Sequence, residues 1–215
     1  MFNDNYFKSL PNNKSDLIRF YSGNNNEIYF DKLSNSDNKY TILLKSNFHF
    51  NIFKLIFFAK RNNLDIFNEN FAKKFSFDDI YFINLPINKS YLIQYYNGKN
   101  KNIYLEQLGK CKDMSDILIK SNFNLDIDDL IEISNKFNLD IYNEKIATKY
   151  NTCDKYFESL PINYTYLIKF YYGKNIELIF TKVKYADDKL NLLLNYKNSE
   201  EVLYEKCIDS NILNA

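Results

Sequence analysis

Side chains that could do chemistry are few in this sequence, and they do not form a catalytic or metal-binding pattern. His49 is the only histidine, so no pair of histidines can hold a metal ion and a histidine-based triad has a single option. Acids cluster at Asp126, Asp128 and Asp129, but this spacing suits the first turn of a helix, where backbone N–H groups lack partners. We therefore predict no catalytic residue, no metal ligand, no cofactor and no enzymatic activity.

Two more carboxylate pairs have a spacing that could in principle share a cation. Asp65 with Glu69, and Asp140 with Glu144, lie four residues apart and would fall on one face of a helix. Each pair lacks a third ligand, and a cation held by oxygen atoms usually needs more. Helix capping is the favoured interpretation.

The cysteines and the apolar segments indicate the compartment. Cys111, Cys153 and Cys207 are odd in number and unevenly spaced, which favours free thiols over a disulfide framework. The first residues lack the basic and apolar regions of a signal peptide. The densest apolar run, residues 52–59, is too short to span a bilayer. We expect a soluble protein in the cytoplasm, without a membrane partner.

Tyrosine is the residue type that could form a binding surface. The chain has 19 tyrosines and no tryptophan, and many tyrosines fall in β-prone runs. Alternate residues of a strand point to opposite faces, so some rings would lie away from the core, where they could anchor a protein or stack on bases. Cross-strand packing is the alternative. The candidate surface is Tyr21, Tyr29, Tyr95, Tyr96, Tyr104, Tyr171 and Tyr172.

The segments that carry these tyrosines occur three times in the sequence. A segment that begins Tyr-Phe, continues through Leu-Pro and ends near Gly-x-Asn starts at residues 6, 81 and 156, at two offsets of 75 residues. The repeat markers are all three prolines and three of the four glycines: Pro11, Pro86, Pro161, Gly23, Gly98 and Gly173. Residues 6–80 and 81–155 share 33 of 75 positions, so one folding unit is repeated.

Within each copy, the first half is predicted to be a β meander. In copy two, residues 91–96 and 102–106 are β-prone and flank Asn97-Gly98, a hairpin signal in which glycine supplies a positive φ. A third strand is expected at 39–45, 116–120 and 189–196. The alternative makes the first run a short helix, capped by Ser15 and ended by Gly23 in copy one.

The second half of each copy has a helical period. Asn51 and Asp126 precede apolar residues that recur at helical spacing, and Asp65 and Asp140 are expected to cap a second helix. The predicted fold class is α+β, with three tandem units of about 75 residues, each a small antiparallel β meander followed by one or two helices. The units are residues 1–80, 81–155 and a truncated 156–215, in which residues 200–209 would form one helix.

The charge and composition of the chain favour some classes of function over others but do not identify one. The 28 basic and 27 acidic residues give a net charge of +1, which offers little attraction to phosphate backbones. The leading hypothesis is a non-enzymatic repeat protein that serves as a protein-protein interaction or scaffold module. A single-stranded nucleic-acid binder is the alternative, with phosphate contacts from Lys8, Lys14, Arg19, Lys45, Lys60 and Arg61, and an enzyme with a pocket between units comes last. The amino-acid usage is typical of an AT-rich genome, such as that of a large DNA virus.

Overall fold

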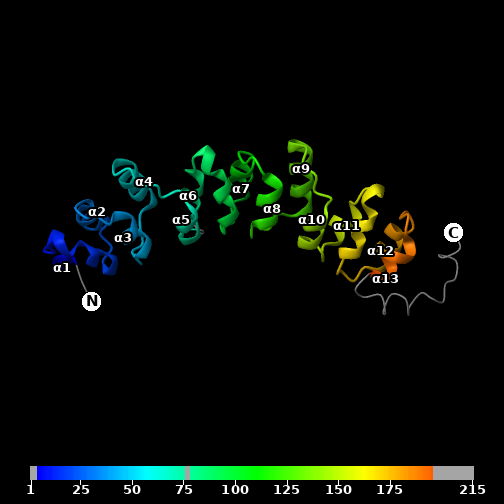
Figure 1. The fold of residues 1–215 in the computed structure, drawn as a ribbon, viewed down its shortest axis with the longest axis horizontal. Coiled ribbons are helices and arrows are strands. Elements are labelled where there is room, and N and C mark those ends of the chain that lie inside the picture. Colours follow the sequence, from blue (N-terminus) through cyan, green and yellow to red (C-terminus); the bar gives the residue numbers. More distant parts are fainter. Residues whose placement is uncertain (1–3, 76–77, 196–215) are drawn as a thin grey trace. The chain divides into compact units, whose positions relative to one another are not determined.

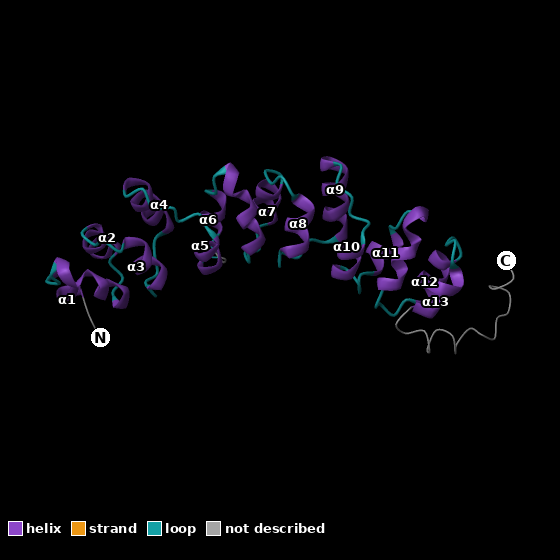
Figure 2. Cartoon of the chain, in the orientation of Figure 1, coloured by secondary structure: helices purple, strands orange, loops and turns teal. Residues whose placement is uncertain are grey.

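The computed structural model describes residues 4–75 and 78–195, and every regular element in these ranges is a helix (Figures 1 and 2). The predicted α+β class is therefore wrong, because the described residues contain no strand. The first set of helices is α1 (Asp4–Lys8), the 3₁₀ helix η1 (Asn12–Phe20), α2 (Asn26–Ser34), α3 (Lys39–Lys45), α4 (Ile52–Arg61) and α5 (Glu69–Lys74).

The same order of helices recurs at the offset seen in the sequence. Copy two has α6 (Asp79–Ile83), η2 (Ile87–Tyr95), α7 (Lys101–Leu108), α8 (Met114–Lys120), α9 (Ile127–Phe137) and α10 (Glu144–Lys149). Copy three has α11 (Asp154–Glu158), η3 (Ile162–Phe170), α12 (Ile176–Val183) and α13 (Lys189–Asn195). The helix predicted at 200–209 lies outside the described residues. The chain forms two compact bodies, residues 1–123 and 124–215, so the boundary between the bodies falls inside copy two.

Each predicted hairpin is instead a pair of helices. The asparagine that follows the repeated glycine caps the second helix and does not form a turn between two strands. The side chain of Asn100 accepts hydrogen bonds from the backbone N–H groups of Asn102 and Ile103, and so begins α7. Asn25 begins α2 and Asn175 begins α12 in the same way. An asparagine at this position satisfies N–H groups that the helix leaves without partners.

The short-helix alternative for the first run is closer to the structure, although its predicted limits are wrong. The helix η1 begins at Asn12 directly after Pro11, and Ser15 lies inside it. The equivalent hydroxyls of Ser90 and Thr165 donate to the carbonyl oxygens of Ile87 and Ile162. The three segments predicted as third strands are α3, α8 and α13, with residue 196 outside the described part.

The helices predicted after Asn51 and Asp126 are confirmed. These two side chains accept hydrogen bonds from Lys54 N and Asp129 N, and so cap α4 and α9. The second helix starts later than predicted. Asp65 and Asp140 accept from the N–H groups two residues on, and the caps of α5 and α10 are Asn68 and Asn143.

The repeated glycines serve close packing, not a left-handed turn. None of the chain's glycines in the described residues has a positive φ. At Gly98, an added Cβ would fall well inside 3.0 Å of the phenol ring of Tyr96, and Gly23 and Gly173 meet Tyr21 and Tyr171 in the same way. The absence of a side chain therefore lets a buried tyrosine ring lie across the backbone two residues after it.

Gly98→Ala is expected to lower the free energy of unfolding by about 1–3 kcal/mol, because the methyl group would displace a buried, hydrogen-bonded ring. Urea unfolding followed by circular dichroism measures this change. Gly109→Ala is the matched control, since Gly109 has φ −62° and ψ −15°, which alanine adopts without strain. Equal effects of the two substitutions would contradict this role for Gly98.

Candidate functional site

Five of the seven tyrosines proposed as a binding surface lie in the core. Tyr21, Tyr96 and Tyr171 are buried, and each hydroxyl donates to the first residue of α1, α6 or α11: Asp4 at 2.5 Å, Asp79 at 2.6 Å, and Asp154. The same hydroxyls accept from the backbone N–H groups of Asn25, Asn100 and Asn175. Each tyrosine therefore ties the first helix of a copy to the cap of α2, α7 or α12.

Burial and these partners also fix the protonation of the tyrosines. Burial, followed by the hydrogen bond to Asp79, raises the pKa of Tyr96 to about 12, and burial with Asp4 does the same for Tyr21. Tyr29 and Tyr104 are fully buried and stack on Phe48 and Phe123, with ring centroids 4.6 Å and 4.3 Å apart. These five rings contribute to stability and are not accessible to a partner.

The other two candidate tyrosines are at the surface but in different settings. Tyr95 is half-buried beside α5, where Lys73 lies 5.0 Å from its ring centroid. Burial, then a hydrogen bond to Glu69, raises the pKa of Tyr95 to about 12. Tyr172 is exposed, and its backbone N–H donates to the carbonyl of Asn151. The seven tyrosines therefore do not form one binding surface.

The carboxylates singled out in the sequence lie at helix starts or in ion pairs. Asp65 Oδ2 lies 3.0 Å from Lys89 Nζ, and Glu144 Oε1 lies 3.1 Å from Lys169 Nζ. Asp128 pairs with Lys155, and Glu69 with Lys73. Across residues 4–75 and 78–195, no group of three histidine, cysteine or acidic side chains is placed to hold a metal ion.

The single histidine and the cysteines are also dispersed. His49 is exposed in the segment between α3 and α4. Cys111 is buried, its thiol donates to the carbonyl of Gln107, and burial raises its pKa. Cys153 is a free thiol that precedes α11, and Cys207 lies outside the described residues.

A groove between α2 and α4 is the surface feature that sequence reasoning missed. It has a volume of about 910 Å³, and the rings of Phe30 and Phe58, 4.9 Å apart, line it. Phe53 and Phe57 on α4 line the groove as well, although 61% and 69% of their surfaces are exposed. Lone exposed apolar residues are ordinary, but two adjacent phenylalanines beside an apolar groove form a patch.

Charged side chains of both signs surround the groove. Glu27 and Asp31 on α2 line one side, and Lys54 and Arg61 on α4 line the other. Lys54 Nζ lies 3.6 Å from Glu27 Oε1, an exposed pair that contributes little stability. The groove thus has an apolar floor with polar sides, the usual composition of a protein-binding site.

The repeated sequence shows that the fold does not require aromatic residues at these positions. At the offset of 75 residues, Phe53 corresponds to Asp128 and Phe57 to Glu132, both exposed on α9. Both helices nevertheless bury the same inner face, with Leu55 in α4 and Leu130 in α9. The comparison of the two copies was the signal in the sequence that could have found this patch.

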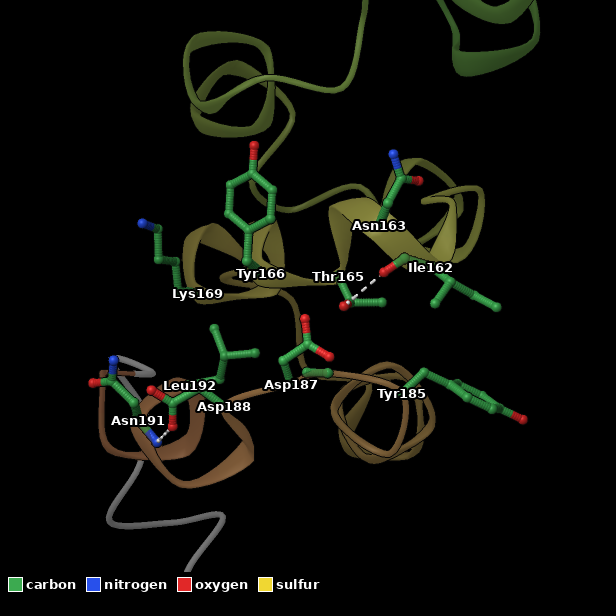
Figure 3. Close-up of a pocket in the computed structure, with 11 residues that line it drawn as sticks. Ile162, Asn163, Thr165, Tyr166, Lys169, Tyr185, Asp187, Asp188, Asn191 and Leu192 are labelled. Carbon is green, nitrogen blue, oxygen red and sulfur yellow. Dashed lines mark hydrogen bonds between the residues drawn. The ribbon is translucent and has the colours of Figure 1, made fainter.

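A second cavity, of about 800 Å³, lies between η3 and the residues around the start of α13 (Figure 3). In the close-up, Asp187 points into the gap below Thr165 and Ile162, while Tyr185 points away from it. Ile162 and Tyr166 are exposed here, but their counterparts in copy two, Ile87 and Tyr91, are exposed as well. Because these residue types recur with the fold, we do not assign this cavity a function.

Comparison of the chain with models of protein families, with curated proteins and with solved structures finds no match. The helices of the described ranges are all too short or too polar to cross a membrane.

Proposed function

We propose that this protein is a non-enzymatic protein-interaction module whose α2–α4 groove binds an amphipathic helix of a partner protein. The observation that carries the proposal is the exposure of Phe53 and Phe57 beside an apolar groove, at positions where copy two has Asp128 and Glu132. A cytoplasmic setting is part of the proposal, and the free thiols of Cys111 and Cys153 support it.

The physical basis is the spacing and the apolar area of the two rings. Phe53 and Phe57 are four residues apart on α4, so their rings lie next to each other on one helical face. Covering an exposed phenylalanine contributes about 1.5–3 kcal/mol. A partner helix with apolar residues at positions i, i+3 and i+4 would fill the groove, and its charged flanks would meet Asp31 and Arg61.

The double variant Phe53→Asp/Phe57→Glu tests this function, because it installs the residues that copy two already has. A library of displayed helical peptides is selected on the full wild-type chain, and the enriched peptides are tested on the variant. We expect apolar residues at helical spacing among the enriched peptides and at least a tenfold loss of affinity for the variant. Ile87→Asp, which alters an exposed residue outside the groove, is the control and should bind as the wild type does.

A library that yields no peptide able to distinguish the wild type from the double variant would refute the proposed site. Circular dichroism of the double variant must match that of the wild type, since both new side chains point to solvent in the equivalent helix α9. This comparison separates loss of binding from loss of folding.

Single-stranded nucleic acid is the second candidate partner, and one observation favours it. Lys54, Lys60 and Arg61 accompany the exposed phenylalanines on α4, a combination that can pair with phosphates and stack on bases. Glu27 and Asp31 on the opposite side of the groove disfavour a phosphate backbone. Salt-dependent binding of a labelled oligonucleotide that is lost in the double variant would support this candidate over the helical partner.

A further inference from the structure

The two helices that form the α2–α4 groove run in the same direction. Near the start of both helices, Lys54 Nζ on α4 lies 3.6 Å from Glu27 Oε1 on α2. Farther along both helices, the ring of Phe30 lies 4.9 Å from that of Phe58. Because residues later in α2 contact residues later in α4, the two helices are parallel, and a third helix can lie along the groove between them.

The length of the groove sets the length of the helix that it can hold. Its lining extends from Asn26 to Ser34 on α2 and from Phe53 to Asn62 on α4. At the rise of an α-helix, these stretches are about 12–14 Å long, which is the length of about nine residues. A partner helix therefore needs between two and three turns to cover the groove, and its apolar stripe must extend over that length.

Beyond the ion pair at its start, the groove has one charged side chain on each wall without a partner in the described part of the chain. Asp31 on α2 and Arg61 on α4 are both exposed, and neither side chain makes an ion pair or a hydrogen bond with another described residue. Asp31 directly follows Phe30, and Arg61 comes three residues after Phe58. The two opposite charges therefore flank the aromatic floor from opposite sides.

Copy two shows that the repeat can neutralise the acid on this wall with a nearby lysine. Glu106 corresponds to Asp31, and its Oε1 accepts a hydrogen bond from Lys110 Nζ at 2.8 Å. In copy one the residue that corresponds to Lys110 is Asn35, whose side chain donates to the backbone carbonyl of Asp31 at 3.2 Å. Copy one thus lacks the cation that pairs with this carboxylate in copy two, and a partner can supply it.

We propose that the helix bound in the α2–α4 groove carries charges of opposite sign on the two flanks of its apolar stripe, with basic residues towards α2 and acidic residues towards α4. This inference rests on the proposed function, because it describes the partner of the same groove. A lysine or arginine of the partner pairs with Asp31, and an aspartate or glutamate pairs with Arg61. A helix with the same charge on both flanks brings like charges together at one wall, which disfavours its binding.

A displayed library of helical peptides tests this charge pattern. Each peptide has leucine at positions i, i+3, i+4 and i+7, and only lysine or glutamate is allowed at the positions that flank this stripe. Selection on the full wild-type chain should enrich peptides with lysine on one flank and glutamate on the other. Selection on Asp31→Lys should enrich glutamate on both flanks, and selection on Arg61→Glu should enrich lysine on both. These results do not depend on the direction in which a peptide lies in the groove.

A synthetic peptide from the wild-type selection measures the size of the effect by fluorescence anisotropy at low salt. Its affinity should fall at least about threefold on Asp31→Lys and on Arg61→Glu, and the loss should shrink as salt is added, because exposed charges are screened. Asp37→Lys and Lys99→Glu make the same changes in net charge at exposed positions outside the groove. These two control variants should bind the peptide as the wild type does.

The results separate this inference from the function on which it rests. Peptides that require Phe53 and Phe57 but show no preference for the charges on their flanks would overturn the charge pattern and leave the groove as a binding site. Selection that yields no peptide able to distinguish the wild type from Phe53→Asp/Phe57→Glu would overturn both. Circular dichroism of the charge variants should match that of the wild type, since each of the replaced side chains is exposed.

Discussion

Tyr156→Ala is expected to lower the free energy of unfolding by about 3–5 kcal/mol, whereas Tyr6→Ala should cost less than about 1 kcal/mol. The two residues occupy equivalent positions of the repeat. Tyr156 is fully buried, and its hydroxyl satisfies the carbonyl of Ile141, while Tyr6 is 39% exposed. Removing the ring of Tyr156 leaves a cavity and an unsatisfied buried carbonyl, whereas Tyr6 is already partly exposed, so less packing is lost with its ring.

Urea unfolding followed by circular dichroism measures both changes under the same conditions. Tyr156→Phe separates the hydrogen bond from the packing, and it should cost about 1–2 kcal/mol because the ring stays in place. An equal loss of the free energy of unfolding for Tyr6→Ala and Tyr156→Ala would contradict the difference in burial between these two tyrosines.

Alkaline pH is expected to unfold the protein cooperatively between about pH 10 and pH 12. Burial raises the pKa of Tyr21, Tyr95, Tyr96 and Tyr150 from 10.0 to about 12. Above pH 10, the unfolded chain releases tyrosine protons that the folded chain retains, so a rise in pH favours unfolding. The stability is fully present below pH 10 and is lost as the pH approaches 12.

Three more tyrosines steepen this dependence, and lysines whose pKa is lowered by burial oppose it. Burial raises the pKa of Tyr29, Tyr81 and Tyr156 further still. Burial lowers the pKa of Lys74 and Lys149, whose unfavourable effect on stability is relieved as the pH rises towards 10.5. Because the tyrosines with a raised pKa outnumber the lysines with a lowered pKa, the net effect of high pH is to favour unfolding.

Parallel titrations by far-ultraviolet circular dichroism and by tyrosinate absorbance check this prediction. The part of the tyrosinate signal that comes from the buried rings should change together with the circular dichroism, since those rings ionise only as the helices unfold. The control is a fully denatured sample, in which tyrosine should titrate near pH 10. Ionisation of all the tyrosines near pH 10 with the helices intact would contradict the burial of these rings.

The most instructive error concerns the first half of each copy, where strands were predicted. Residues such as Ile103 and Tyr104 favour strands, and the Asn and Gly residues before them favour hairpin turns. Asparagine is also a strong helix cap, and Asn100 acts as one. Aromatic and β-branched residues form helices here because both Ile103 and Tyr104 are buried against neighbouring helices, and packing outweighs their weak local preference.

Whether the candidate tyrosines could form a binding surface also depended on whether these segments are strands or helices. Tyrosines placed on a pleated strand would alternate between core and surface, whereas in the structure five of the seven candidates are buried. Phe53 and Phe57 lie in the dense apolar run of residues 52–59, which by itself shows no obvious polar face. Their counterparts Asp128 and Glu132 mark the face that points to solvent.

By itself, the sequence determined the threefold repeat, the marker prolines and glycines, and the caps of α4 and α9, because matching copies and capping residues can be read along the chain. Only the tertiary structure decided between strand and helix in the first half of each copy, and only it separated Tyr6 from Tyr81 and Tyr156. The physical reason is that identical residues with similar local sequence differ in exposure according to what packs against them. That information lies in contacts between distant segments, not in the residues themselves.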